Sequence, residues 1–438
     1  MATTPKDQQM FRVGQWLPED HRILKDWLRD TIQASDSKGH ETLHSSIEAL
    51  WKAIDSDARL YMLFNSMFAE LPTKKPYQDD PAGHHQVRDA RHMCQIMNHL
   101  LSTAPQWTHH AHVSGTVGLP FNALLDWPMG TSSGWAIFLD PVVNKHLKEI
   151  LNAWGSYLQS HGSANVLGDD PKGWFGPEGK KELVRVANEP YGTNYKFEEL
   201  FVCQPDRQYH GYKSWDDFFT RAYREGIRPV ADFDNDDVLA NACESKPYRV
   251  ARSVSAKDEF WVKGQPYSVR NMLAQDKLAE QFVGGTVYQA FLSALSYHRW
   301  HSPVSGTILK QYIVSGTYFS EPLFTGMADP HGPDPFGEGT GQGYLSSVAT
   351  RALIFIEADN PKIGLICVMP IGMVEVSTCD VTVKDGQHVK KGEELGMFHF
   401  GGSSHCVLFR RGVKIEAFPQ PGQKENVPVR GKLGHVVD

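Results

Sequence analysis

A short run near the end of the chain, Gly401-Gly402-Ser403-Ser404, contains the residue types that a self-cleaving peptide bond requires. Glycine lets a neighbouring group approach its carbonyl carbon closely, and the hydroxyl of a serine directly after it can attack that carbonyl. A run of this composition is also typical of a flexible turn. Apolar, strand-like segments at 395–400 and 406–409 flank it, which favours a fixed position in a sheet.

A serine nucleophile needs a base, and two histidines three residues apart, His298 and His301, are candidates. Histidine exchanges a proton near neutral pH, which suits it to this task. Glu244 carries a carboxylate that could orient a histidine, so that Ser403, His301 and Glu244 would act as nucleophile, base and orienting group. The alternative is structural: such histidine pairs often only hydrogen-bond within the fold, and a lone glutamate in a loop is usually solvated.

The first half of the chain has the apolar spacing of helices. Apolar residues recur at helical intervals over 42–54 and 57–71. Asp140 and Pro141 have the types of a helix-capping residue followed by proline at the first helical position. We therefore expect a helical domain over residues 1–205, whose aromatic and leucine stripes form core faces.

The second half has the pattern of short strands separated by turns rich in Gly, Asp and Pro. The strand-like runs lie at 248–251, 260–262, 285–291, 306–314, 352–356, 363–368 and 373–376. The segment 384–393 has two turns around a two-residue strand. We expect an α+β fold in which a β-rich domain, 206–438, follows the helical domain. The Gly-, Pro- and Asp-rich stretch 320–343 is long for a connecting loop, so we expect a lid or a disordered segment there.

The composition excludes several classes of protein. The chain has 438 residues, of which 41% are hydrophobic and 22% charged, as in ordinary globular proteins. A net charge of -7 and the lack of a long basic run argue against nucleic-acid binding. No run of roughly 18 apolar residues is present, so we expect no integral membrane association. Residues 1–18 lack the apolar core of a secretory signal.

The cysteines and histidines do not form a metal-binding pattern. The six cysteines are scattered without a C-x-x-C pair, at Cys94, Cys203, Cys243, Cys367, Cys379 and Cys406. The histidines of the first half also lack metal-ligand spacing; they are His84, His85, His92, His109, His110 and His112. We expect no metal site, no disulfide framework, and a reducing, cytoplasmic location.

Several segments in the second half together resemble one known family. They are Trp215–Val230, Val262–Ser268, Tyr297–Gly306, and Lys391–Gly396 running into Phe400–Ser404. In this order they resemble the phosphatidylserine decarboxylase family of pyruvoyl enzymes. The helical first half, Ala242–Ser245 and Gly401–Ser404 most resemble its fungal L-tryptophan decarboxylase branch. The resemblance covers about 230 residues and implies that 206–438 is the catalytic domain.

This resemblance implies a position for the cut. The family cleaves itself before the serine of a Leu-Gly-Ser-Thr motif, which corresponds here to Phe400–Ser404 with an extra glycine and Ser404 in place of threonine. Aligning the Gly-Ser pair places the scissile bond at Gly402–Ser403. A shift of one residue would place it before Ser404, which remains the alternative.

The resemblance also implies roles for three other residues. His301 matches the family's processing histidine, and His298 matches a second active-site histidine that handles substrate. Glu244 matches the position of the processing aspartate, but it is a glutamate followed by Ser245 instead of glycine. The resemblance therefore predicts that Glu244 orients His301, although the residue type differs from that of the family.

The implied chemistry converts a residue into a cofactor. Ser403 Oγ would attack the Gly402 carbonyl to give an ester, and elimination would then leave a dehydroalanine at position 403. Hydrolysis would release ammonia and leave a covalent pyruvoyl group at the start of a small chain, 403–438. That group accepts electrons while an amino acid loses CO2, as pyridoxal phosphate does elsewhere.

The substrate is expected to be a small molecule, namely a soluble amino acid. An aromatic L-amino acid, with tryptophan favoured, would need an apolar pocket, and Trp300, Phe398 and Phe400 lie near the motifs that could line it, as do Phe319 and Phe336. Phosphatidylserine is the alternative substrate. A serine hydrolase lacks support because no G-x-S-x-G motif is present, and an uncut, non-catalytic binding protein remains a further alternative.

Overall fold

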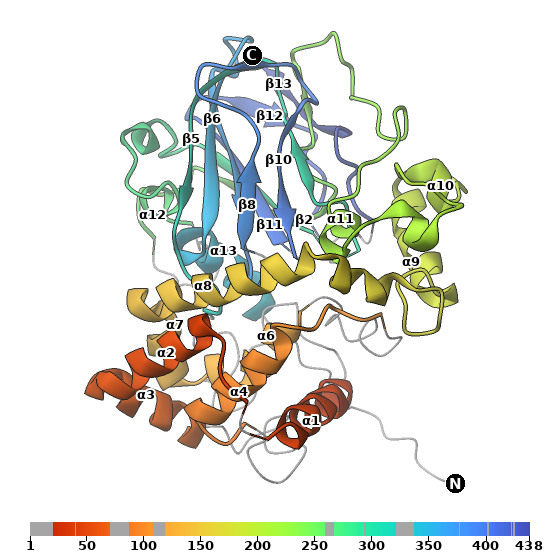
Figure 1. Cartoon of the computed structure of the whole chain (residues 1–438). Coiled ribbons are helices and arrows are strands. Elements are labelled where there is room, and N and C mark those ends of the chain that lie inside the picture. Colours follow the sequence, from red (N-terminus) through yellow and green to blue (C-terminus); the bar gives the residue numbers. More distant parts are fainter. Residues whose placement is uncertain are drawn as a thin grey trace, which may run out of the picture.

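The computed structural model has the expected α+β architecture, with helices in the first part of the chain and antiparallel sheets in the second (Figure 1). It describes residues 21–39, 41–70, 87–107, 119–258, 267–292, 295–320, 337–375, 377–400, 403–421, 423 and 425–438. Within these ranges, the side chains of 21–27, 126–127, 337–340 and Ser403 are not described. Phe336 and the strand expected at 260–262 lie outside the described residues.

The helical part is built from α-helices and short 3-10 helices, several of which begin at a capping side chain. Its helices are α1 His21–Ser37, α2 Ser45–Ser56, α3 Ala58–Ala69, α4 Ala90–Leu100, α6 Pro120–Met129, α7 Ser132–Leu139, α8 Pro141–Leu158, η2 His161–Leu167, α9 Pro177–Asn188, η3 Glu189–Tyr191, α10 Phe197–Leu200, η4 Gln208–Gly211 and α11 Trp215–Phe219. The carboxylate of Asp140 accepts hydrogen bonds from the backbone N–H groups of Val142 and Val143 at the start of α8. This confirms the cap expected there, with Pro141 at the first helical position.

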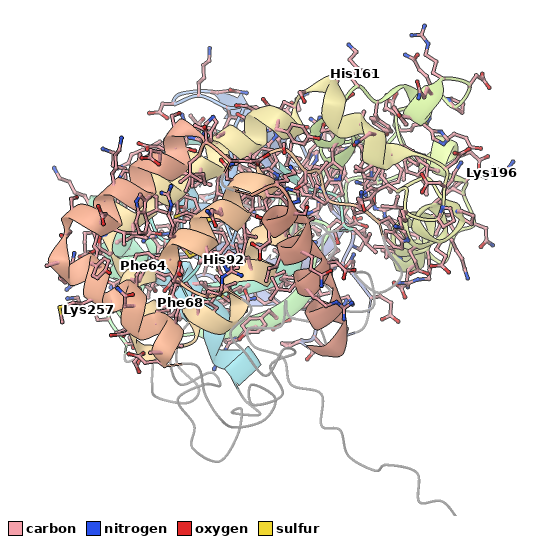
Figure 2. All side chains as sticks on the ribbon, turned by 60° about the horizontal axis from the view of Figure 1, so that its bottom comes forward. Phe64, Phe68, His92, His161, Lys196 and Lys257 are labelled. Atoms are coloured by element: carbon pink, nitrogen blue, oxygen red, sulfur yellow. The ribbon has the colours of Figure 1, made fainter. Side chains whose placement is uncertain are left out.

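The apolar stripes of these helices form a shared core. Phe64 and Phe68 of α3 are buried among the helices, and Figure 2 shows them on the helical side of the molecule together with His92 of α4. In contrast, Lys196 lies at the rim of the same view. Burial of these large rings supplies much of the driving force for packing the helices together.

The β-rich part contains three antiparallel sheets. Its strands are β1 Val238–Ala240, β2 Lys246–Arg252, β3 Thr286–Leu292, β4 Arg299–His301, β5 Gly306–Val314, β6 Arg351–Ala358, β7 Leu365–Ile371, β8 Thr378–Val381, β9 His388–Val389, β10 Glu394–His399, β11 Ser403–Phe409, β12 Lys414–Glu416 and β13 Lys432–Val437. The seven-stranded sheet has the order β2-β3-β11-β7-β6-β5-β9, and the two three-stranded sheets are β4-β10-β8 and β1-β13-β12. The predicted two-residue strand within 384–393 is confirmed as β9.

The helix α8 connects the two parts of the molecule. Figure 1 shows α8, in yellow, crossing beneath the ends of β8 and β11, with α2, α3 and α4 on its other side. Three short helices lie among the strands: α12 Val269–Met272, η5 Lys277–Gln281 and α13 Gly337–Val348. The predicted cleavage segment lies between β10 and β11 in the chain, and Phe400, directly after β10, contacts Trp154 of α8.

Two local predictions differ from the structure in part. The stretch 320–343 was expected to be a lid or a disordered segment; residues 321–336 lie outside the described residues, but its last part is helical, because Gly337 begins α13, which continues to Val348. Several of its residues are buried, including Tyr344 and Leu345, so packing outweighs the poor helix propensity of its glycines. The run 373–376 was expected to be a strand, but residues 373–375 belong to the connection between β7 and β8.

Candidate active site

The predicted cleavage segment joins strands of two different sheets. β10 ends at His399, and β11 begins at Ser403. Gly401 and Gly402 lie outside the described residues, and so does the Ser403 side chain, so the predicted scissile bond itself is not described. The backbone of Ser403 pairs with Leu292 of β3, which fixes the position of the chain directly after that bond.

The hydroxyl group of Ser404, the alternative nucleophile, both donates and accepts a hydrogen bond. Its buried Oγ donates to the Ala290 carbonyl at 3.2 Å and accepts from Gln289 Nε2 at 3.1 Å. Gln289 is itself held by the Tyr267 hydroxyl, which donates to Oε1 at 2.6 Å. Ser404 is therefore part of a buried hydrogen-bond network within the sheet.

His301 lies in β4 and is fully surrounded by protein. Its Nδ1 is 2.9 Å from the Gly392 carbonyl oxygen, and its Nε2 is 3.2 Å from the Tyr297 hydroxyl. Arg430 also approaches, with Nε 3.2 Å from Nδ1. Burial and the Arg430 charge lower the pKa of His301 to about 3. The imidazole is therefore neutral near pH 7 and keeps on one ring nitrogen the lone pair that a base needs.

Glu244 does not contact His301 in this structure. Its carboxylate forms a buried pair with Arg228, with Nη2 2.6 Å from Oε1 and Nε 3.0 Å from Oε2. The Val429 N–H donates to Oε2 at 2.8 Å, and the Tyr223 hydroxyl lies 3.4 Å from Oε1. We expected this carboxylate to orient His301 directly, but it forms an ion pair with Arg228 instead.

An indirect connection between Glu244 and His301 runs through the end of the chain. Glu244 holds the backbone of Val429, and the next residue, Arg430, places its guanidinium against His301. Both contacts involve the predicted small chain, 403–438. No motif pointed to Arg430, whereas Arg228 lay within a family segment but had no assigned role.

His298 lies just before β4 and is buried against an aromatic ring. Its imidazole stacks on Phe219 with ring centroids 3.9 Å apart, and its carbonyl accepts a hydrogen bond from the Phe398 N–H. Phe398 and Trp300, two of the predicted pocket residues, are fully buried and pack edge to face at 4.8 Å. Both rings therefore serve as core packing beside His298.

Phe400 contacts the helical part of the molecule. Its ring packs on Trp154 of α8, with centroids 5.8 Å apart, and Trp154 packs on Phe121 of α6 at 5.3 Å. Trp154 was expected to belong to the helical core only, because its spacing in α8 is that of an apolar stripe. Helical spacing cannot reveal that this ring also reaches the cleavage segment.

A buried carboxylate lies in the connection that follows β7. Glu375 accepts hydrogen bonds from the backbone N–H groups of Phe121 at 2.9 Å and of Asn122 at 3.2 Å, in the first turn of α6. Burial raises the pKa of Glu375 to about 8, against the opposing effect of these hydrogen bonds. The sequence showed an ordinary glutamate, because its helical partner lies about 250 residues earlier in the chain.

Two more histidines flank the cleavage segment. His399 places Nδ1 2.8 Å from Asp216 Oδ1 of α11. Burial opposes protonation, but the bond to Asp216 and the nearby charge of Asp380 outweigh it and raise the pKa of His399. His405 of β11 is completely buried, neither of its ring nitrogens has a hydrogen-bond partner, and burial lowers its pKa to about 3. A period-two strand pattern separates His405 from Ser404, which faces the other side of the sheet.

The described residues contain no cluster of three or more His, Cys, Asp or Glu side chains that could hold a metal ion. Of the histidines considered in the first half, His92 is described; its Nε2 is 3.1 Å from Asp36 Oδ1. Among the helices in the described ranges, none is long and apolar enough to cross a bilayer. All six cysteines are free thiols.

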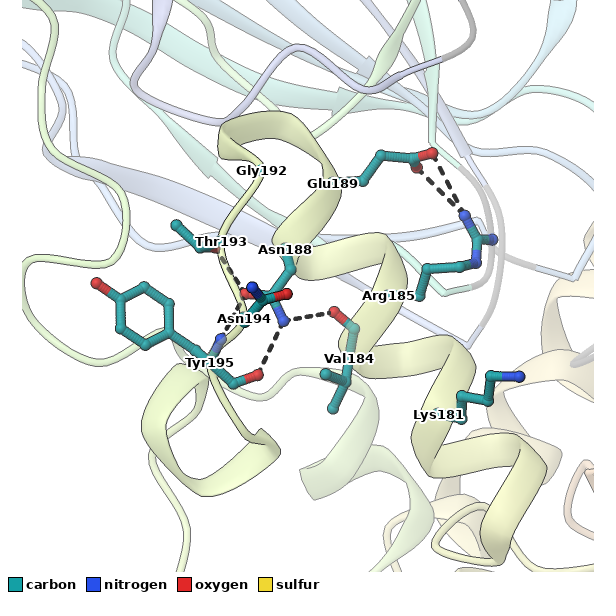
Figure 3. A pocket seen from close by; sticks show the side chains of 9 residues that line it. All are labelled: Lys181, Val184, Arg185, Asn188, Glu189, Gly192, Thr193, Asn194 and Tyr195. Carbon is teal, nitrogen blue, oxygen red and sulfur yellow. Dashed lines mark hydrogen bonds and ion pairs between the residues drawn. The ribbon is translucent and has the colours of Figure 1, made fainter.

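The pocket in Figure 3 lies on α9 and the loop after it, away from the cleavage segment. It has a volume of about 460 Å³ and includes none of the predicted site residues. Asn188 closes one side by accepting a hydrogen bond from Thr193 Oγ1 at 2.6 Å and donating to the Tyr195 carbonyl at 2.8 Å. Arg185 pairs with Glu189 on the other side. The pocket is thus lined mainly by polar and charged side chains that bond to one another, unlike the apolar pocket that an aromatic substrate needs.

Comparison with known proteins gives consistent matches along the chain. A family model described as phosphatidylserine decarboxylase matches residues 215–433, and a second one matches residues 44–183. The chain is 48% identical over 299 residues to "Decarboxylase iboD" of Amanita muscaria, covering 67% of this chain and 84% of that protein. It is 34% identical over 441 residues to "L-tryptophan decarboxylase" of Psilocybe cubensis, covering 96% and 94%.

A more distant relative matches about half of the chain. The chain is 30% identical over 218 residues to "Phosphatidylserine decarboxylase proenzyme 3" of Schizosaccharomyces pombe, covering 50% of this chain and 21% of that protein. The family segments seen in the sequence, from Trp215 to Ser404, lie within the range 215–433 that one family model matches. One family model spans half of the chain, and a relative above 30% identity spans nearly all of it. The chain belongs to the phosphatidylserine decarboxylase family of pyruvoyl-dependent enzymes and is a decarboxylase.

Proposed function

We propose that the chain cleaves itself at Gly402–Ser403 and then converts an aromatic L-amino acid, tryptophan first, to its amine and CO2. In this proposal a helical domain, 1–205, precedes a catalytic domain, 206–438, and the enzyme works in the cytoplasm. Six free thiols support a reducing compartment. The observation that carries the cleavage site is the occupied hydroxyl of Ser404, which leaves Ser403 as the serine for the reaction.

The surroundings of Ser403 fit a pyruvoyl group formed in place. Its backbone begins β11, which lies between β3 and β7 in the seven-stranded sheet, so the new chain start would stay anchored after the cut. The pyruvoyl group supplies an electron sink for the loss of CO2. His298 is proposed to contact the substrate or return a proton to it, and Phe400 to contribute an apolar wall. Trp300 and Phe398 are proposed to support the pocket as buried packing beside His298.

The proposed cleavage uses two further residues. His301 is the base that takes the Ser403 hydroxyl proton, because its imidazole is neutral over the physiological range of pH. Glu244 acts as a positioning residue: it fixes Val429 and thereby Arg430, which contacts His301. This replaces the direct triad with an arrangement that runs through the predicted small chain.

A soluble amino acid fits the relatives better as the substrate than a phospholipid does. The proteins named L-tryptophan decarboxylase match nearly the whole chain, including its helical half. The proteins named phosphatidylserine decarboxylase from yeasts match about half of it. The relative at 48% identity is named as a decarboxylase without a substrate, so aromatic amino acids other than tryptophan belong in the test.

Cleavage is tested by the intact mass of the purified protein under denaturing conditions. We expect a large chain ending at Gly402 and a 36-residue chain, 403–438, whose start is blocked to Edman sequencing. Ser403→Ala should stay whole and inactive, and Ser404→Ala is the control that should still be cut. If Ser404→Ala stays whole while Ser403→Ala is cut, the scissile bond lies one residue later.

Substrate choice is tested by measuring CO2 and amine release from the cut enzyme. The panel contains tryptophan, tyrosine, phenylalanine, a non-aromatic amino acid and phosphatidylserine vesicles, with the uncut Ser403→Ala protein as background. We expect tryptophan to give the highest kcat/KM. Release from phosphatidylserine alone would contradict the amino-acid proposal but leave self-cleavage standing.

A further inference from the structure

Phe400, the last described residue before the predicted cut, has an unusual backbone conformation. Its φ of 78° lies in the left-handed region, which is unfavourable for a residue with a side chain. Its ring is buried and packs on Trp154 of α8. A strained conformation persists only where the surrounding packing fixes it. Trp154 is therefore part of what holds the backbone next to the cleavage site.

The close approach of α8 depends on a glycine. A Cβ atom added to Gly155 would lie 2.5 Å from Cζ and 2.8 Å from Cε2 of the Phe400 ring. Glycine is less favourable than alanine inside a helix, yet it occupies this buried position in the 18-residue α8. An alanine here would force the ring away from its place and move the backbone that the ring anchors.

The helical part holds the neighbouring connection as well. Glu375, between β7 and β8, accepts hydrogen bonds from the first turn of α6 at Phe121, and the Phe121 ring packs on Trp154. One continuous set of contacts therefore runs from Glu375 through Phe121 and Trp154 to Phe400. Figure 1 shows the matching arrangement of α6 and α8 beneath the ends of β8 and β11.

The strand register places the ends of the β7–β8 connection beside the ends of the β10–β11 connection. Ile371, at the end of β7, pairs with Ser404 of β11. Thr378, at the start of β8, pairs with His399 of β10. The connection that carries Glu375 joins β7 to β8, and the predicted cleavage segment joins their paired neighbours, β11 and β10. The first turn of α6 contacts Glu375, and α8 contacts Phe400.

We propose that the helical N-terminal part is a built-in clamp for self-cleavage, and that Trp154 and Gly155 are positioning residues for Phe400. The inference rests on the proposed self-cleavage and extends it by giving the helical part a role in maturation. Attack on a carbonyl requires the nucleophile and the carbon in near-attack geometry, and a displacement of about 1 Å can slow such a step on the order of a hundredfold. Freeing Phe400 would cause a displacement of this kind.

The test compares Gly155→Ala with Gly162→Ala, whose added Cβ would meet only Ser160 Oγ at 3.6 Å and Tyr157 Cε2 at 3.8 Å. Each full-length precursor is made by cell-free translation, and the uncut fraction is followed on a denaturing gel. We expect Gly162→Ala to be cut at the wild-type rate and Gly155→Ala to be cut at least tenfold more slowly. Equal rates for all three proteins would overturn the clamp. A wild-type chain that stays whole would instead overturn the proposed function.

A second variant separates positioning from folding. Phe400→Leu in the Gly155→Ala background removes the outer ring atoms that the new methyl group would meet and keeps an apolar side chain against Trp154, so we expect it to restore part of the lost rate. The thermal unfolding midpoint of each uncut chain is measured in the Ser403→Ala background. A folded Gly155→Ala protein with a slow cut supports the clamp. If the double variant folds but remains as slow as Gly155→Ala, collision with the ring is not the cause and the proposal fails.

Discussion

At the scale of single residues, the candidate site depends on burial more than on paired charges. His301 and His405 are both enclosed by protein, and burial keeps both imidazoles neutral, with pKa values of about 3. The carboxylate that would raise the pKa of a catalytic histidine is instead paired with Arg228. A neutral histidine retains its lone pair over a wide range of pH, at the expense of being a weak base.

This environment predicts how cleavage responds to pH. Because His301 stays neutral down to about pH 4, the rate of cleavage in the wild-type chain should be flat between about pH 5.5 and 8. Arg430→Gln removes a nearby charge that lowers the pKa, so the pKa of His301 should rise and cleavage should weaken at the acid end. The measurement is the cut fraction of newly translated chain against pH.

The exposed Arg411 provides a matched control from the same small chain. Arg411→Gln makes the same change in charge at a distance from the described contacts of His301, so its pH profile should follow the wild type. A wild-type rate that falls with a midpoint near the ordinary histidine value of about 6.5 would contradict the assigned pKa.

At the scale of elements, the first turn of α6 and the connection after β7 form a single unit. Glu375 accepts the N–H groups that a helix start leaves without partners. A negative charge is favoured at a helix start, but complete burial opposes that charge and raises the pKa to about 8. The carboxyl group is therefore largely protonated at neutral pH and becomes charged as the pH rises through about 8.

The raised pKa links stability to pH in a definite direction. Between 4.5, the ordinary value, and about 8, the unfolded chain loses this proton while the folded chain keeps it. Stability should therefore decrease with rising pH in that interval, by up to about 1.4 kcal/mol per pH unit from this group. Glu375→Gln removes the effect, so its unfolding midpoint should exceed that of the parent protein increasingly from pH 5 to pH 8.

The comparison is made in the uncut Ser403→Ala background, with exposed Glu357→Gln as the control. Glu375→Ala should be less stable at every pH, because it leaves buried N–H groups without an acceptor, at a cost of about 1–3 kcal/mol. Parallel stability curves for Glu375→Gln and its parent would show that the carboxyl group titrates at its ordinary pKa.

At the scale of the whole molecule, the sequence allowed the prediction of those features that depend on residues adjacent in the chain. The Asp140 cap, the strand 306–314 and the family segments were predicted because each depends on a few adjacent positions. The helix α13 was missed because its glycines are stabilised by packing. The contacts of Phe400 with Trp154 and of Glu244 with Arg228 join separate elements, and no local pattern encodes such contacts.

The central place of β11 has a consequence for the life of the mature protein. The strand that would begin at the cut lies between β3 and β7, and the same small chain supplies β12 and β13 to another sheet. Once cut, the enzyme would be a complex of two interlocked chains, so refolding after denaturation would depend on concentration and would have to bring separate molecules together. Its durability would then be set by the rate at which it opens, as in other kinetically stable proteins.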